Sequence, residues 1–118
     1  MDAELDPEDA KIITLARATR ARGGAASGAA VRDDTGRTYA AVDVALESVS
    51  LSALQLAVAM AYSSGGTRLE AAAVVTGADV DGSALDAAWE LGAAHVLVAG
   101  PDGAVLHAHL NPQSPASA

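Results

Sequence analysis

The chain contains no cysteine. Without thiols it can form no disulfide, hold no thiolate-bound zinc and use no cysteine nucleophile. Phenylalanine is also absent and tryptophan occurs once, so any core must be built mainly from small side chains. Basic residues are few, with 7 Lys and Arg against 15 Asp and Glu and a formal net charge of -8. This charge argues against nucleic-acid partners, because affinity for phosphate backbones comes largely from Lys and Arg.

Long hydrophobic runs are absent as well. No stretch approaches the roughly 18 consecutive apolar residues that indicate a membrane span, and the acidic start MDAELDPEDA lacks the basic and apolar regions of a signal peptide. We therefore expect a cytoplasmic protein that does not bind membranes. The 118 residues suffice for one core. We place a single domain at residues 1–110 and expect a disordered tail at 111–118.

Turn residues divide the chain into three helices and five strands. Asp6 and Pro7 are typical of a helix start, and Gly23 and Gly24 of its end. The turn at 34–37 contains the glycine that a tight hairpin favours, and alternating strands and helices further on imply parallel pairing with right-handed crossovers. The predicted elements are a helix at 7–22, strands at 28–33 and 38–45, a helix at 51–64, a strand at 69–76, a helix at 83–91, and strands at 95–99 and 104–109, the last returning antiparallel.

Several short strings carry a resemblance to a known family. The run Ser27–Val31 followed by Thr35–Tyr39 resembles the VGAA strand and the DG-x-x-Y hairpin of small cytidine deaminases. Val96–Ala99 with Asp102 and Gly103 resembles their penultimate strand and DG turn. The order and spacing of these strings match those of the family, and the resemblance covers roughly residues 8 to 110. It implies a three-layer α/β fold, with helices on both faces of a mixed five-stranded sheet in the order α-β-β-α-β-α-β-β.

The same resemblance implies that the family's chemistry is missing. In cytidine deaminases a zinc ion activates water and a glutamate moves the proton. The first ligand position falls on Ser52 and the glutamate position on Leu54, while the other two ligand positions fall on Asp81 and Ala84. Serine is a poor zinc ligand and alanine donates nothing. We therefore assign no catalytic residue, no metal ligand and no cofactor.

Substrate-binding positions also differ from the family. The N-x-E that grips ribose hydroxyls falls on Asp43–Ala45, where only Asp43 can still accept a hydrogen bond, and the aromatic residue near the base falls at about Ala25. The resemblance thus implies a vestigial pocket, by which we mean six residues. They are Asp43, Ser52, Leu54, Asp81, Gly82 and Ala84.

The two helix starts at this pocket allow alternatives. Ser50 or Ser52, and Asp81, are side chains that cap helix N-termini, and simple capping of a zinc-free fold is the expected role. A second hypothesis is that the converging N-termini bind an anion such as phosphate. A third is an enzyme of different chemistry, for which Asp43 and Asp81 are the available pair of carboxylates.

The three histidines and the tryptophan are further candidates for a functional role. His107 and His109 are two residues apart in a predicted strand, so both lie on one face and could bind a transition metal, with His95 on a neighbouring strand as a third ligand. The alternative, which we expect, is a solvated pair on an edge strand. No G-x-S-x-G motif presents a nucleophile. Trp89 is expected to make a core or subunit contact.

These observations predict a catalytically inactive cytidine deaminase-like protein, a pseudoenzyme. We expect it to act as an interaction or scaffolding module and to form a homodimer or homotetramer, since relatives in the family generally do. An unknown protein partner also remains open. The alternative is a regulatory protein that binds a nucleoside, a nucleotide or another small anion in the vestigial pocket.

Overall fold

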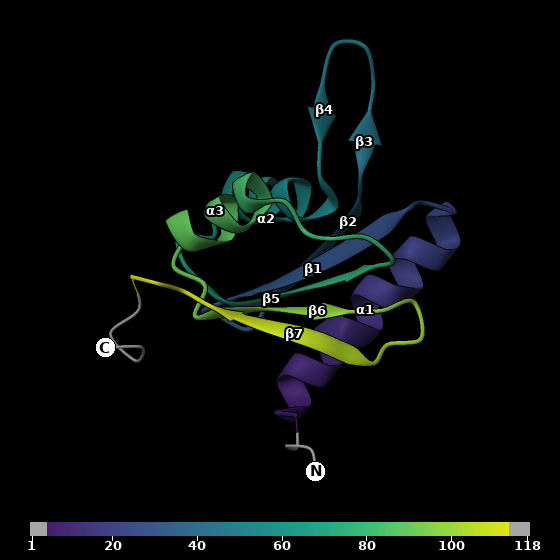
Figure 1. The fold of residues 1–118 in the computed structure, drawn as a ribbon. Helices are drawn as coiled ribbons and strands as arrows, with labels where there is room; N and C mark the ends of the chain where they lie inside the picture. The colour runs from purple at the N-terminus through teal and green to yellow at the C-terminus, as the bar shows by residue number, and fades with distance from the viewer. Residues whose placement is uncertain (1–4, 114–118) are drawn as a thin grey trace.

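The computed structural model describes residues 5–113 (Figure 1). Its first helix, α1 (Pro7–Gly23), begins where the sequence predicts, because the Asp6 side chain accepts a hydrogen bond from the Glu8 N-H at 2.8 Å. It ends at Gly24, whose φ of 60° is a left-handed conformation that glycine adopts without strain. No helix among residues 5–113 combines the length and hydropathy needed to cross a membrane.

Five strands form one mixed sheet in the order β2-β1-β5-β6-β7. Their bounds are β1 (Ser27–Asp33), β2 (Thr38–Val42), β5 (Leu69–Thr76), β6 (His95–Ala99) and β7 (Val105–Leu110). β5 and β6 are parallel, and the other neighbouring pairs are antiparallel. The carboxyl ends of β5 and β6 therefore meet at one edge of the sheet, where open α/β sheets commonly bind ligands.

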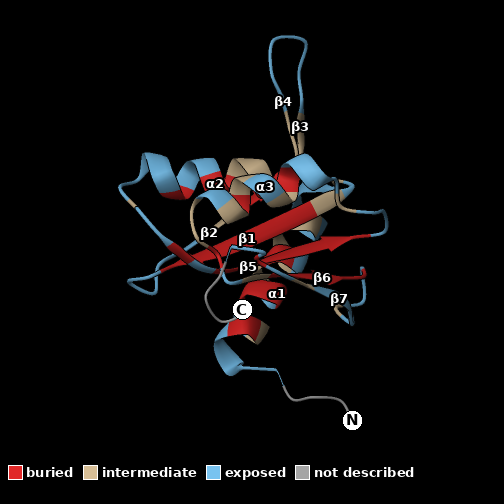
Figure 2. Cartoon of the chain, turned by 60° about the vertical axis from the view of Figure 1, so that its left-hand side comes forward, coloured by how far each residue is buried: buried red, intermediate tan, exposed pale blue. Residues whose placement is uncertain are grey.

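Helices cover both faces of this sheet, as predicted. α1 packs on one face, and α2 (Ala53–Ser63) and α3 (Gly82–Glu90) lie on the other (Figure 1). Side chains alternate along each strand, so Ala29 and Val31 pack towards α2 and α3 while Ala30 packs towards α1. Figure 2 shows the buried strands between these helical layers. The predicted three-layer α/β fold is confirmed.

The sequence predicts one strand at 38–45, and the predicted end of this strand is wrong. β2 stops at Val42, and β3 (Val44–Ala45) pairs instead with β4 (Ser50–Leu51) in a two-stranded ribbon that projects from the body of the molecule (Figure 1). The break lies at Asp43, whose Oδ1 accepts the Ser27 N-H at 3.0 Å and so joins the end of β2 to the start of β1. The tip of the ribbon exposes two apolar side chains, Leu46 and Val49.

A buried ionic cluster between α1 and the sheet was not foreseen. Arg32 on β1 donates from Nε to Glu70 Oε1 at 2.8 Å, and its Nη2 lies 3.0 Å from Asp9 Oδ1. The second contact is an ion pair without hydrogen-bond geometry, because Asp9 Oδ1 has no hydrogen-bond partner among the described residues. The other Asp9 oxygen lies 2.8 Å from His95 Nε2. Burial opposes the charge, but the carboxylates of Glu70 and Asp9 outweigh it and raise the pKa of Arg32.

The hairpin between β1 and β2 is organised by Asp33, which is 2% exposed. Its Oδ1 accepts hydrogen bonds from the backbone and hydroxyl of Thr35 and from the Arg37 N-H. Burial alone raises the pKa of Asp33, but these bonds and the Arg37 charge outweigh it, so that the pKa of Asp33 is lowered. The native state therefore favours the carboxylate.

This lowered pKa of Asp33 predicts a pH-dependent contribution to stability. The contribution is present above the unfolded pKa of roughly 3.9 and is lost as the pH falls through the lower folded value. Asp33→Asn should therefore lower the free energy of unfolding more at pH 7 than at about pH 3, as measured by urea denaturation. The exposed neighbour offers a control, Asp34→Asn. An Asp33→Asn loss that is equal at both pH values contradicts the assignment.

The end of the described chain packs closely. Asn111, which we expected to begin a disordered tail, is 4% exposed. Its side chain donates to Ala93 O at 2.8 Å and its backbone N-H to Ala94 O at 3.0 Å. Asn111 therefore belongs with the folded body. Residues 114–118 of the expected tail lie outside the described residues.

Candidate functional site

A cavity of about 190 Å³ lies at the starts of α2 and α3, beside the ends of β2 and β5. The residues of the vestigial pocket come together here, since Asp43, Ser52, Leu54, Asp81 and Ala84 all line it. Gly82, the sixth, is the first residue of α3 and follows Asp81 directly. The remaining lining residues are Ser27, Ala53, Val74, Thr76, Asp79 and Val80.

The N-terminus of α2 is capped by side chains at its own start. Ser52 Oγ accepts the Gln55 N-H at 3.0 Å, and Gln55 Oε1 accepts the Ser52 N-H at 2.9 Å, which together form a capping box. The predicted capping role of Ser52 is confirmed, whereas Ser50 lies in β4. Because these groups satisfy each other, the α2 terminus has fewer donors to offer a ligand.

The start of α3 differs from the prediction. Asp81 occupies the N-cap position, but its side chain makes no capping hydrogen bond to the helix backbone. Instead, Asp81 Oδ2 accepts the Ser83 hydroxyl at 3.0 Å. The capping role that we predicted for Asp81 is therefore wrong, and the carboxylate is held beside the cavity by a neighbouring side chain.

Two polar groups of the cavity wall, Thr76 and Asp79, were not predicted from the sequence. Thr76, at the carboxyl end of β5, is 3% exposed. Its Oγ1 accepts hydrogen bonds from the Ser27 hydroxyl at 2.8 Å and from the Ala78 N-H at 3.1 Å. Asp79, in the loop after β5, adds a third carboxylate to those of Asp43 and Asp81. The position of Thr76 at a strand end was the signal that could have identified this wall.

The side chains at this cavity do not fit a tetrahedral zinc ion. Zinc sites in proteins use cysteine, histidine and carboxylate ligands, and the chain has no cysteine. Of the three positions where the resemblance places zinc ligands, Ser52 is occupied by its capping box and Ala84 has no donor atom, which leaves Asp81. Leu54, at the glutamate position, is buried and cannot accept a proton. Among residues 5–113, no three His, Asp or Glu side chains are close enough to hold a metal ion.

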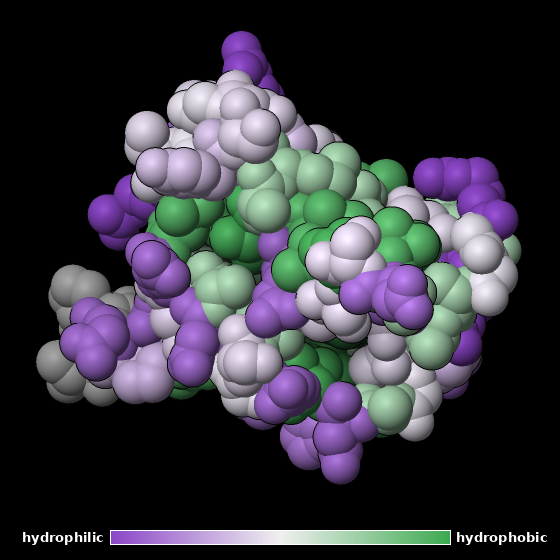
Figure 3. Space-filling view, turned by 90° about the horizontal axis from the view of Figure 1, so that it is seen from above, coloured by the Kyte–Doolittle hydropathy of each residue, from purple (hydrophilic) through white to green (hydrophobic). Residues whose placement is uncertain are grey.

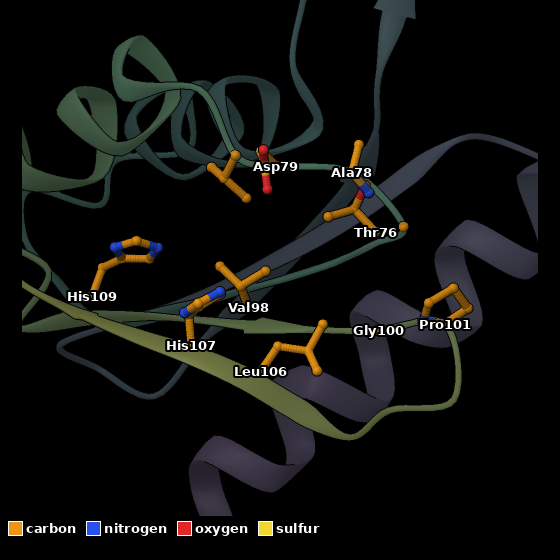
Figure 4. Close-up of a pocket in the computed structure, with 11 residues that line it drawn as sticks. Thr76, Ala78, Asp79, Val98, Gly100, Pro101, Leu106, His107 and His109 are labelled. Atoms are coloured by element: carbon orange, nitrogen blue, oxygen red, sulfur yellow. The ribbon is translucent and has the colours of Figure 1, made fainter.

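A larger cavity of about 500 Å³ adjoins the first and shares Thr76, Asp79 and Val80 with it. His107 and His109 project into this cavity from β7, opposite the loop that carries Asp79 (Figure 4). The alternative hypothesis that His95 could supply a third metal ligand beside them is wrong. His95 pairs with Leu110 in the β6–β7 ladder and points to α1, where it contacts Asp9.

The outer surface of α2 and the ribbon carries apolar side chains. Viewed from the side of the ribbon and the two helices, apolar surface gathers near the middle of the face among polar groups (Figure 3). Met60 and Tyr62 on α2 are exposed, as are Leu46 and Val49 on the ribbon. Trp89 is partly buried and packs against the core beneath α2 and α3.

Comparisons with known proteins point to one family. A family model described as cytidine deaminase-like matches residues 5–103. The crystal structure of cytidine deaminase from Burkholderia pseudomallei is 21% identical with a TM-score of 0.74, and the match covers 88% of this chain and 96% of that one. Cytidine deaminase from Mycobacterium tuberculosis is 24% identical with a TM-score of 0.69, covering 93% and 98%. No curated protein matches the sequence.

Proposed function

The chain belongs to the cytidine deaminase-like family, and we propose that it is a catalytically inactive member, a pseudoenzyme. One observation carries this proposal. The cavity where the family's zinc site is expected brings together Ser52, Leu54 and Ala84, of which the first is occupied in capping and the other two have no polar side-chain atom. Function must be argued from the site rather than from the fold, and this site has no set of zinc ligands and has Leu54 where the family's proton-carrying glutamate is expected.

The positive role that we propose is an interaction or scaffolding module in the cytoplasm that associates with copies of itself. The exposed apolar residues on α2 and the ribbon support it, because Tyr62 is 66% exposed and Leu46 is 62% exposed. Figure 3 shows apolar surface near the middle of the face that carries α2 and the ribbon, and contiguous exposed apolar surface is typical of protein interaction sites. The net charge of -8 opposes association of like chains, and apolar burial at this face would offset that repulsion.

A second candidate is ligand binding in the remaining cavity. Its volume of about 190 Å³ is below the roughly 300–1,000 Å³ of ordinary small-molecule sites. The three Asp carboxylates at its wall repel phosphate, and the capping box at Ser52 uses donors that an anion would need. The structure therefore supports a smaller range of ligands for this cavity than the sequence alone suggested. A neutral nucleoside suits the cavity better than a nucleotide.

Deamination is the first test of the proposal. The purified chain, supplied with zinc, should convert cytidine and deoxycytidine to the uracil products no faster than the protein-free blank, as followed by chromatography. A working cytidine deaminase prepared in the same way is the positive control. Turnover that rises in proportion to the concentration of this chain contradicts the proposal.

Light scattering and thermal unfolding test the positive role. We expect a dimer or tetramer at micromolar concentrations and no change in the unfolding temperature with nucleosides. A ligand present at about 100 times its dissociation constant adds roughly 2.7 kcal/mol of stability, so binding is easily detected. A monomer that a nucleoside stabilises would replace the scaffolding role with the binding role.

A further inference from the structure

The two histidines on β7 form a feature that the proposed function does not use. His107 and His109 lie opposite Val98 and Val96 in the antiparallel ladder with β6. β7 is the edge strand of the sheet, and its ladder with β6 fixes the backbone that carries the two histidines. Residues two apart in a strand share a face. Both imidazoles are therefore directed into the cavity of about 500 Å³ shown in Figure 4.

The spacing of the two rings suits a shared metal ion. Their centroids are 5.9 Å apart. A metal bonded to one nitrogen of each ring at about 2.0–2.1 Å lies roughly 3.2 Å from each ring centre, so one ion can join centres up to roughly 6.4 Å apart. The observed separation is within this limit, so the two rings are close enough to share one ion when a nitrogen of each faces it.

The surroundings favour a cation. Asp79 lines the cavity opposite the rings, and the net charge of the chain is -8. Neutral imidazole is the commonest protein ligand for transition metals. Among the described residues, no further His, Asp or Glu lies close enough to the two rings to act as a third ligand. An ion held here therefore keeps open positions for water or for a small ligand in the cavity.

We propose that His107 and His109 form a two-histidine chelate for a divalent transition metal, at a place distinct from the vestigial pocket. Affinity should follow the general order for nitrogen ligands, with Cu²⁺ bound more tightly than Ni²⁺ or Zn²⁺, and Mg²⁺ should not bind because it prefers oxygen. Ser52 and Leu54 are not part of this site. Metal binding here therefore neither requires nor supplies deaminase activity.

Titration of the full chain with each metal alone tests the proposal. Isothermal calorimetry should give one Cu²⁺ and one Zn²⁺ per chain. His107→Asn and His109→Asn should each weaken binding at least tenfold, and the double variant should abolish it. Unfolding curves recorded without metal verify that the variants fold.

His95 provides an internal control, because it is the remaining histidine of the chain and contacts Asp9 on the other face of the sheet. In NMR spectra, substoichiometric Cu²⁺ should broaden the ring signals of His107 and His109 together and leave those of His95 sharp. Single variants that keep the affinity of the unmodified chain, or a double variant that still binds, overturn the chelate even if the chain proves inactive as a deaminase.

Discussion

Gly28→Ala is expected to lower the free energy of unfolding by about 3 kcal/mol, the upper part of the usual range for overpacking a core. A Cβ at this position would lie 2.4 Å from Ala16 O, 2.8 Å from Arg20 Cβ and 2.9 Å from Arg20 N. Two of these atoms belong to the α1 backbone, so a side-chain rotation cannot relieve the contact. The helix would have to move away from β1, which also loosens the packing of Ile12 and Ile13.

Gly77→Ala is the matched control for this prediction. Gly77 follows β5 directly, and a Cβ there would meet no atom within 4 Å. Its effect should stay within about 0.5 kcal/mol. Urea unfolding of the two variants against the unmodified chain measures both values. Equal, small effects would mean that α1 yields easily and that close contact at Gly28 is not required.

Gly28 also explains why part of the fold could be predicted from the sequence. It is the glycine of the VGAA-like string, and the structure gives this string a physical reason, because only glycine allows α1 to lie so close to β1. Elements with local signals were predicted correctly in type. Asp6 marks the start of α1, and the turn before Arg37 joins β1 to β2. These signals act over a few residues and are therefore visible in a sequence.

The errors concern side chains whose contacts the local sequence pattern does not determine, and in two of the three cases the partner is distant in the sequence. His95 contacts Asp9, 86 residues away, and no local pattern indicates which face of β6 it occupies. Asp43 ends β2 because its carboxylate reaches Ser27, 16 residues back. Asp81 is a good capping type in a good position, yet it accepts from Ser83. In each case a tertiary or competing contact overrides the local preference.

The residues of the vestigial pocket were predicted only in part. The family resemblance identified Asp43, Ser52 and Ala84 as neighbours although they come from separate elements, and all three line one cavity. The resemblance could not identify Thr76 or Asp79, because their role depends on how the loop after β5 folds back over the strand ends. Family motifs thus predict which residues lie together in a site. The hydrogen bonds between those residues can be assigned only from the three-dimensional structure.

Arg32→Met should be similarly damaging to stability, at about 3 kcal/mol. Removing one partner from a buried ion pair costs roughly 3–5 kcal/mol, because the other charge stays buried without compensation. The side chains of Arg32 and Asp9 are 10% and 9% exposed. Asp9 would keep His95 as its neighbour, which limits the loss. The surface pair Lys11–Glu8, with exposures of 72% and 55%, is the control, since Lys11→Met should cost less than about 1 kcal/mol.

A double-mutant cycle separates the ion pair from general packing. If the cost of Arg32→Met comes from stranding the Asp9 charge, then neutralising that charge first should reduce it. Asp9→Asn combined with Arg32→Met should therefore lose at least about 1 kcal/mol less than the sum of the two single variants, within the usual range of coupling between contacting residues. Strict additivity would show instead that Arg32 and Asp9 act independently, so that a stranded Asp9 charge does not explain the cost of Arg32→Met.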